Sequence, residues 1–314
     1  MTLCNAAETH SGRGSGNLCL MRNLTLACAL ALCSLVAAEC GAAKPIPAVA
    51  EIPFRWTPGQ IEVQVSIEGR PPIWCVLDSG AEFSMLDEEV AKTWKIGPIV
   101  RSEGRERIEN AAVRIGSFLL PRQPFTLWKL DNFRRQKRDI GGVIGCELFE
   151  RYVVTVDFQK RVVILNEPRT YQPPVAARRV PITFDGRLPV IQAALTIRGK
   201  KIPARLMIDT GASQALILRY PFATAQRFLG SADETKTSET VATGRRPFIT
   251  IAVDQLDLDR WTFKSPKTTA YGSPAGAGGY TSTDGLLGND VLQHFRVSFD
   301  YSRKQVVFEE RRDN

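Results

Sequence analysis

Two stretches of this chain, 141–165 and 284–308, align without a gap, and this repeat limits the folds available to it. The first reads GGVIGCELFERYVVTVDFQKRVVIL, and the second reads DGLLGNDVLQHFRVSFDYSRKQVVF. The alignment places Gly145 on Gly288 and Asp157 on Asp300. A repeat with so long a period predicts two lobes rather than a solenoid of short units.

Three further correspondences connect the two halves in the same order. VSIEGR (65–70) matches LTIRGK (195–200), and WCVLDSGAEFSMLD (74–87) matches RLMIDTGASQALIL (205–218). Apolar positions between 113 and 125 match those between 251 and 263. The offset between matched positions rises along the chain, which indicates collinear halves with small insertions in the second. We therefore expect an internally duplicated chain.

Each half has the pattern of a β domain. Apolar residues alternate with other residues through 61–67 and 154–158, and this period of two is typical of strands. A single short helix per half is expected, after Gly145 and after Gly288. The stretch 166–181 holds four prolines without apolar periodicity and is typical of a linker. The sequence predicts an all-β fold with lobes at 44–170 and 171–314.

The composition argues against catalysis or metal binding by histidine and against a phosphate-binding loop. The 314 residues include two histidines, His10 and His294, and His10 lies in a segment expected to be removed. His294 alone cannot build a multi-histidine metal cage, and its expected surface role argues against a Ser-His-Asp site. No G-x-x-x-x-G-K-[ST] phosphate loop occurs. His294 is expected at the surface, and no metal or cofactor is expected. Carboxylates remain as the candidates for catalysis.

The net charge of +8 is spread along the chain. The densest basic run contains Arg134, Arg135, Lys137 and Arg138, without aromatic residues or a recognition helix around it. We expect this run to be a solvated surface, and we expect no nucleic-acid partner.

Residues 1–43 have the layout of a leader with a signal peptide. Met21 and Arg22 precede an apolar run from 24 to 38, and small residues follow. That run is short for a membrane span, and Met21 is a candidate for the true start. Export to the periplasm or secretion is the expectation. Anchoring by a lipid at Cys40 is disfavoured by Glu39, and an uncleaved anchor is a further alternative.

Cysteine usage agrees with this division. Five of the seven cysteines lie in the leader, which leaves Cys75 and Cys146. Two cysteines do not make a disulfide framework. Pairing of the two and two buried free thiols are both open alternatives.

The repeated acids are Asp78 and Asp209, each at the end of an apolar run and followed by Ser or Thr and then Gly. A lone Asp-Ser-Gly is most often a turn. Equivalent residues near a pseudo-two-fold axis meet, however, so two such motifs in paired lobes would place the acids face to face. Carboxylates at that separation share one proton and can hold a water between them.

The neighbouring residues suit the same arrangement. The hydroxyls of Ser79 and Thr210 can reach backbone groups of the opposite lobe, and Gly80 and Gly211 permit tight turns. The glycines of two apolar-apolar-Gly runs are expected to pack beneath the acid loops. These glycines are Gly145 and Gly288.

The order apolar-apolar-Asp-[Ser/Thr]-Gly-Ala, with an apolar-apolar-Gly run later in the same half, resembles the retropepsin-like aspartic proteases. The resemblance covers both halves, roughly residues 55–310, and is nearest to exported bacterial aspartyl proteases with two retroviral-type units in one chain. It implies closed-barrel lobes about a pseudo-two-fold axis and a cleft for extended peptide. It also implies flap hairpins, which would lie near 99–112 and 233–248.

By position the resemblance assigns catalysis to Asp78 and Asp209. The supporting acid loops would be Ser79, Gly80, Ala81, Thr210, Gly211 and Ala212. The flap segments lack the family's glycine-rich tip, so no flap residue is assigned. Cys146-Glu147 in the first half also differs from Asn289-Asp290 in the second.

The sequence therefore predicts a monomeric aspartic endopeptidase that binds peptide or protein substrate in extended conformation. Alanine at 81 and 212, where pepsin-type enzymes have a hydroxyl, predicts a mildly acidic to near-neutral optimum. A catalytically silent peptide-binding protein on the same scaffold is the alternative. Pairing of each unit with its copy in another chain is a third possibility.

Overall fold

The computed structural model describes residues 49–311, except 58, 103, 137, 229–234, 242–243 and 275–281. These residues belong to one compact unit, Ile46–Asn314. The expected leader at 1–43 lies outside the described residues. Within the described part of the chain, no helix combines the length and the apolar character needed to cross a bilayer.

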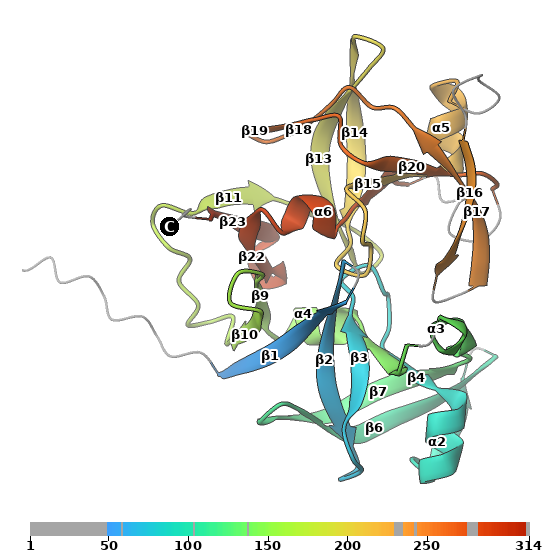
Figure 1. The fold of residues 1–314 in the computed structure, drawn as a ribbon. Helices are drawn as coiled ribbons and strands as arrows, with labels where there is room; N and C mark the ends of the chain where they lie inside the picture. Colours follow the sequence, from blue (N-terminus) through green and yellow to red (C-terminus); the bar gives the residue numbers. More distant parts are fainter. Residues whose placement is uncertain are drawn as a thin grey trace, which may run out of the picture. The chain divides into compact units, whose positions relative to one another are not determined.

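Strands account for 54% of the structure and helices for 12%, which confirms the all-β class. The larger of two sheets has thirteen strands (Figure 1). In spatial order they are β11 (Arg178–Pro181), β23 (Gln305–Glu310), β22 (Phe295–Asp300), β9 (Val153–Asp157), β10 (Val162–Asn166), β1 (Ala50–Thr57), β2 (Gln60–Ile67), β3 (Ile73–Leu77), β8 (Ile140–Ile144), β4 (Met85–Asp87), β7 (Phe118–Trp128), β6 (Arg105–Ile115) and β5 (Ile99–Ser102).

The second sheet has ten strands and is built only from residues after 180. In order they are β16 (Thr235–Val241), β17 (Gly244–Ile251), β20 (Thr268–Tyr271), β15 (Leu216–Leu218), β21 (Gly285–Leu287), β14 (Lys200–Ile208), β13 (Leu188–Ile197), β18 (Gln255–Leu258) and β19 (Trp261–Lys264), with β12 (Thr183–Asp185) beside β13.

Part of the larger sheet closes into a barrel. Strand β2 pairs with β3 on one side and with β6 on the other, so β2, β3, β8, β4, β7 and β6 form a ring of six strands. The second sheet repeats the parallel pairings of this ring, β14 with β21 and β15 with β20. Among the described residues it has no pairing that closes it. The structure therefore holds one closed barrel and a second sheet, where the sequence predicts two closed barrels.

Strands from both halves of the chain share the remainder of the larger sheet. Strand β22 pairs antiparallel with β9, and Val297 lies opposite Val156. Across the same pair, the buried hydroxyls of Thr155 and Ser298 are hydrogen-bonded at 2.7 Å. Equivalent strands of the two halves are thus joined by a continuous ladder, which fixes the position of one half against the other.

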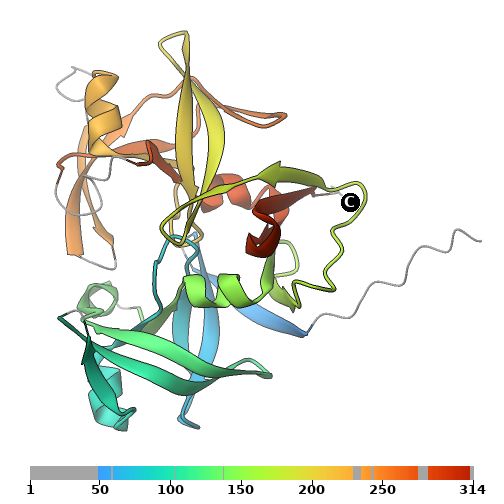
Figure 2. The same cartoon turned by 180° about the vertical axis from the view of Figure 1, so that it is seen from behind.

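The expected helices after Gly145 and Gly288 are present as α4 (Cys146–Arg151) and α6 (Asn289–Leu292), visible in Figure 2 near the centre of the molecule. His294, just after α6, is exposed as expected. Each half has more than one helix, however. The others are α2 (Glu88–Trp94), α3 (Asp131–Arg135), α5 (Tyr220–Ala225) and the short 3-10 helix η2 (Tyr301–Arg303).

The first unexpected helix, α2, has a local sequence signal. Asp87 is its N-cap and accepts hydrogen bonds from the backbone N–H groups of Glu89 and Val90. Two glutamates follow in the first turn, where the helix dipole favours negative charge. The period-two pattern of the surrounding strands masks this short helix. The expected linker also contains structure, because Arg178–Pro181 forms β11 and pairs with β23.

Strand pairing also corrects one of the sequence correspondences. Val65 lies opposite Ile115, and its counterpart Leu195 lies opposite Leu256. Ile115 therefore corresponds to Leu256 and not to Val253, with which the sequence match pairs it. The extra residues of the second half lie before β18. They fall around β16 and β17, which form a longer hairpin than β5 makes with β6.

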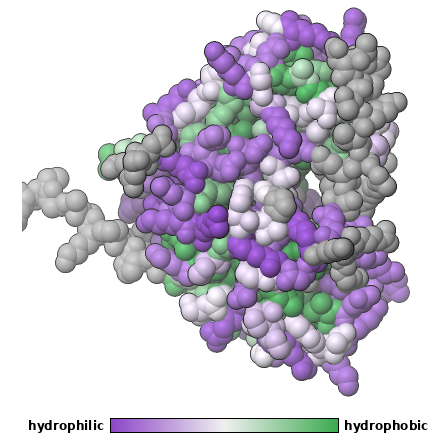
Figure 3. Space-filling model, in the orientation of Figure 1, coloured by the Kyte–Doolittle hydropathy of each residue, from purple (hydrophilic) through white to green (hydrophobic). Residues whose placement is uncertain are grey.

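Both segments expected to be flaps contain strand hairpins. Residues 99–112 include β5 and the start of β6, with Gly104 near the tip at a φ of +75°. Residues 233–248 include β16 and part of β17. Figure 3 shows that one face of the molecule is mainly hydrophilic with separate apolar patches. The large apolar side chains instead fill the barrel and the space beneath the shared sheet.

Phe299 in β22 is buried where the two halves meet, and its ring lies edge-on to that of Phe149 at 5.2 Å. Replacing Phe299 with alanine is expected to lower the free energy of unfolding by about 3–5 kcal/mol, because the cavity cannot collapse between two joined halves. Urea denaturation measures this. Leu119→Ala, at a position that is 52% exposed, is the control and is expected to change stability by less than about 0.5 kcal/mol. Equal losses in the two variants would contradict this account of the core.

Candidate active site

The two repeated acids stand at the ends of equivalent strands. Asp78 follows β3, and its backbone N–H donates to the carbonyl of Ile144 at 2.9 Å. Asp209 follows β14, and its N–H donates to the carbonyl of Leu287 at 3.0 Å. Each acid is thus held by the last residue of a parallel neighbour. Each of the two buried strands is therefore followed directly by a carboxylate at the edge of the core.

The loops that carry these acids exchange hydrogen bonds. The Ser79 N–H donates to the Thr210 hydroxyl at 2.9 Å, and the Thr210 N–H donates to the Ser79 hydroxyl at 3.0 Å. The Ser79 hydroxyl then donates to the carbonyl of Ile208, and the Thr210 hydroxyl to that of Leu77, both at 2.8 Å. Ser79 and Thr210 are fully buried. The four bonds lock the loops together.

Each loop glycine packs against the acid of the opposite loop. A Cβ atom on Gly80 would lie 2.6 Å from the carboxyl carbon of Asp209, and a Cβ on Gly211 would lie 2.5 Å from that of Asp78. No side chain fits at either position. The absence of side chains lets the two carboxyl groups approach, and they are hydrogen-bonded to each other. The structure therefore brings together two acids that lie in different halves of the sequence.

Their surroundings favour a shared proton. Burial raises the pKa of both Asp78 and Asp209, and the charge of Asp209 raises that of Asp78 further. The hydrogen bond between the acids raises the pKa of Asp78 and lowers that of Asp209. Two buried carboxyl groups with one hydrogen bond between them hold one negative charge more readily than two.

Backbone donors oppose this effect without cancelling it. The Gly80 N–H donates to Asp78 Oδ1 at 2.8 Å, and the Gly211 N–H donates to Asp209 Oδ1 at the same distance. A second donor, the Ala212 N–H, reaches Asp209 Oδ1 at 3.1 Å. Such donors stabilise an ionised carboxylate. The methyl groups of Ala81 and Ala212 add no further donor.

The glycines of the apolar-apolar-Gly runs lie beneath the loops. A Cβ on Gly145 would lie 2.8 Å from the carbonyl oxygen of Ala81, and a Cβ on Gly288 would lie 2.7 Å from that of Ala212. The same carbonyls accept the first N–H of α4 and of α6, at 3.0 and 2.8 Å. Close backbone contact with each acid loop therefore requires glycine at both positions.

Each half also extends a hairpin turn onto the acid loop of the other. A Cβ on Gly59, between β1 and β2, would lie 2.6 Å from that of Ser213, and a Cβ on Gly186, between β12 and β13, would lie 3.1 Å from the Glu82 carboxylate. Glu82 and Ser213 occupy equivalent places after their acids. The turns therefore make equivalent contacts, but the side chains that fasten them differ.

The second acid loop is held by hydrogen bonds from side-chain amides. Gln60 Nε2 donates to the carbonyl of Gly211 at 2.6 Å. Asn289 Nδ2 donates to the carbonyls of Thr210 and Gly59, at 2.7 and 2.8 Å. Asn289 is buried at the start of α6 and thus ties the acid loop to the β1–β2 turn.

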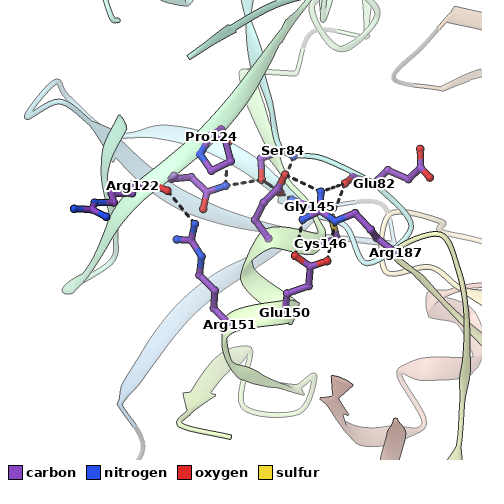
Figure 4. Close-up of polar contacts among 11 residues, drawn as sticks. Glu82, Ser84, Arg122, Pro124, Gly145, Cys146, Glu150, Arg151 and Arg187 are labelled. Carbon is purple, nitrogen blue, oxygen red and sulfur yellow. Dashed lines mark hydrogen bonds and ion pairs between the residues drawn. The ribbon is translucent and has the colours of Figure 1, made fainter. Parts of the chain in front are cut away.

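The first acid loop is held by an arginine that is itself paired with carboxylates. Arg187, just before β13, donates through Nη1 to the carbonyl of Glu82 at 2.7 Å and pairs with both oxygens of Glu150, at 2.7 and 2.6 Å. Figure 4 shows Arg187 turned towards Glu82, Cys146 and Glu150. A longer contact of 3.4 Å reaches the buried carboxylate of Glu147. That carboxylate accepts from the N–H and hydroxyl of Ser84, at 2.9 and 2.8 Å.

A further network corrects the expectation for the basic run. Arg138 is not solvated: its side chain is 14% exposed and pairs with the fully buried Glu62. Arg55 pairs with the other oxygen of Glu62, and Arg138 also donates to Gln60. A buried carboxylate requires such partners. The cationic pair therefore supports the glutamine that reaches the second acid loop.

A pocket of about 240 Å³ opens beside Asp209 and Gly80. Both halves contribute to its walls, and most of the lining is apolar. The lining residues are Glu82, Phe83, Met85, Trp128, Leu188, Met207, Arg219, Tyr271 and Leu286. The acid pair therefore borders a space suited to a large apolar side chain.

The remaining thiols and metal-ligating side chains form no second centre in the described residues. Cys75 and Cys146 are both buried free thiols, which decides between the two alternatives left open by the sequence. Burial raises the pKa of each thiol, so neither is a ready nucleophile. No group of three or more metal-ligating side chains occurs in the part of the chain that the structure describes.

A family model described as aspartyl protease matches residues 193–291. This range contains Asp209, its loop and Gly288, but not Asp78. The match supports an aspartyl protease family. No curated protein matches the chain at a significant level.

Three residues at or beside the acid loops were not predicted from the sequence: Gln60, Arg187 and Arg219. Gln60 and Arg187 each directly follow a turn glycine, Gly59 and Gly186. This shared position in the two halves is a signal that could have identified them. Arg219 directly follows β15 in LILR, but nothing local distinguishes it from a surface arginine.

Thr210→Val removes one hydroxyl and preserves the shape of the side chain. It leaves the buried N–H of Ser79 and carbonyl of Leu77 without a partner, so the free energy of unfolding is expected to fall by about 2–4 kcal/mol. Thr210→Ser keeps the hydroxyl and is expected to lose less than about 1 kcal/mol. Denaturant titration of both variants measures the difference, and equal stability of the two would argue against the interlocked loops.

Proposed function

We propose that this chain is an aspartic endopeptidase in which Asp78 and Asp209 activate water for peptide hydrolysis. The observation that carries the proposal is the reciprocal packing of each loop glycine on the opposite carboxylate. It leaves two buried acids in contact at the edge of an apolar pocket. The aspartyl protease match over residues 193–291 supports the same reaction class.

The chemistry needs only the two acids and a water molecule. The ionised acid takes a proton from the water, and the water oxygen forms a bond to the peptide carbonyl carbon. The protonated acid donates its hydrogen bond to the developing oxyanion, as a carboxyl group kept neutral by its surroundings can. The C–N bond then breaks, and the leaving nitrogen takes a proton from the acid that received one from the water. One proton remains shared by the pair.

The proposed substrate is a peptide or protein segment in extended conformation. The pocket beside Asp209 is walled by Trp128 and Tyr271 among other apolar groups, so a large apolar side chain next to the scissile bond suits it. The hairpins β5–β6 and β16–β17 are the proposed flaps.

We further propose that the chain is a duplicated pseudo-dimer, with lobes at 44–170 and 171–314. The hydrogen bonds between Ser79 and Thr210 are made within one chain, which supports a monomer as the active form. The leader supports export to the periplasm or secretion.

Incubation of the purified chain with a mixed peptide library tests the activity. Cleavage is expected for the wild type and should be abolished in Asp78→Asn and in Asp209→Asn, because either change removes the acid–carboxylate pair. A statine-type inhibitor should block the wild type. Leu119→Ala serves as a control that keeps the pair intact.

Cleavage that persists in both asparagine variants would reject the acid pair. Peptide binding without cleavage in the wild type would instead favour a silent binding protein.

The pH profile provides a separate expectation. Activity needs one protonated and one ionised acid, so it falls below the lower apparent pKa of the pair and above the higher one. Burial raises the pKa of Asp78 and Asp209, which moves this window upwards. The expected optimum of kcat/KM is mildly acidic to near-neutral, whereas a maximum near pH 2 would contradict the proposal.

A further inference from the structure

One cation lies buried beside the acid pair on the side of the second half. Arg219 is 3% exposed and lines the same pocket as Asp209. It follows β15 and is the N-cap residue of α5. Its Nε donates to the hydroxyl of Thr283 at 2.9 Å, and its backbone N–H donates to the carbonyl of Asp284 at the same distance. The backbone bond therefore fixes the residue, and the bond to Thr283 fixes its side chain.

The N-cap of the corresponding helix in the first half has the opposite charge. There, β4 leads into α2, and the N-cap residue is the fully buried Asp87. Its carboxylate accepts backbone N–H groups of Glu89 and Val90 through Oδ1 and of Leu130 through Oδ2, at 3.0, 3.4 and 2.9 Å. The two halves thus repeat their strands and their glycines but not this charge.

Backbone N–H groups act on both acids: those of Gly80 and Ala81 lower the pKa of Asp78, and those of Gly211 and Ala212 lower that of Asp209. Asp209 Oδ1 accepts from two backbone donors, Gly211 and Ala212, at 2.8 and 3.1 Å. Asp209 is also the more buried of the two acids. The positive charge of Arg219 lowers the pKa of Asp209, which opposes the raising effect of burial. A cation in a poorly solvated site acts far more strongly than the same charge in water.

We propose that Arg219 orders the charge within the acid pair, so that Asp209 is the ionised member and Asp78 carries the shared proton. Arg219 is a positioning residue that acts through Asp209. Combined with the proposed function, on which the catalytic part of this inference rests, Asp209 takes the proton from water. Asp78 then donates its hydrogen bond to the peptide oxygen.

The other polar groups around the pair do not reproduce this effect. Asp78 faces Asp209 from the first loop, and Glu82 is an exposed carboxylate at the pocket wall that water screens. Tyr271 of β20 also lines the pocket. Arg187 donates to the Glu82 carbonyl of the first acid loop, and its charge is paired with Glu150.

The test compares Arg219→Met and Arg219→Lys in the full chain, with Arg114→Met at an exposed site of β6 as a charge-matched control. The Met variant should move the acidic limb of the kcat/KM profile upwards by about one pH unit, since an opposite charge this near shifts a carboxyl by about that much or more. The Lys variant should restore most of the wild-type profile, and the control should leave it unchanged.

Carboxyl-carbon NMR with labelled aspartate gives a readout that does not require activity. In the wild type the last proton to leave the pair should belong to Asp78, assigned with Asp78→Asn. In Arg219→Met the first deprotonation of the pair should move to higher pH. If no variant cleaves peptide but this shift occurs, the proposed function fails and the charge order stands.

Thermal melting reports whether each variant folds. If Arg219→Met unfolds, Arg219→Gln against Arg219→Lys gives the same comparison of polar side chains with and without charge. Unchanged titration of the pair in a folded neutral variant would overturn the proposal. So would a loss confined to KM for acidic peptides with both pH limbs fixed, because Arg219 would then bind substrate.

Discussion

The reciprocal hydrogen bonds between Ser79 and Thr210 are the interaction on which the site depends. They are buried and made between backbone groups and hydroxyls, so they fix the separation of the two acid loops. The separation places Gly80 and Gly211 on the opposite carboxyl groups, which leaves the two acids in contact. Burial raises the pKa of both acids, and the contact with Asp209 raises that of Asp78 further. The pairing of β9 with β22 also fixes the position of one half against the other.

The two halves achieve similar contacts by different chemistry. The second acid loop is fastened by the amides of Gln60 and Asn289, and the first by the ion pairs of Arg187. The two halves also differ at the N-caps of α2 and α5, which are a buried acid, Asp87, and a buried cation, Arg219. When two halves of one chain pair with each other, matching places can carry different residues, because each half needs to fit only the other. A symmetric dimer would have to place the same residue on both sides.

The sequence predicted the β class, which the structure confirms, and it proposed the two acids, their hydroxyl neighbours and the glycines beneath them as a site. These positions could be predicted because each rests on a local requirement, such as Gly145 and Gly288 against a backbone carbonyl, and because the requirement occurs twice. The helices α2 and α5 were missed because no glycine of the repeat precedes them, whereas Gly145 and Gly288 mark the starts of α4 and α6. The roles of Arg138, Arg187 and Arg219 could not be predicted, since a buried arginine and a surface arginine look alike until their carboxylate or hydroxyl partners are known.

In the proposed active form, the folded chain holds Asp78 and Asp209 against each other with one proton between them. A neutron crystal structure, grown in heavy water near the expected pH optimum, measures this most directly. One deuteron is expected in a hydrogen bond that joins the two carboxyl groups. Two separated carboxylates, each with its own water shell and no deuteron between them, would contradict the claim.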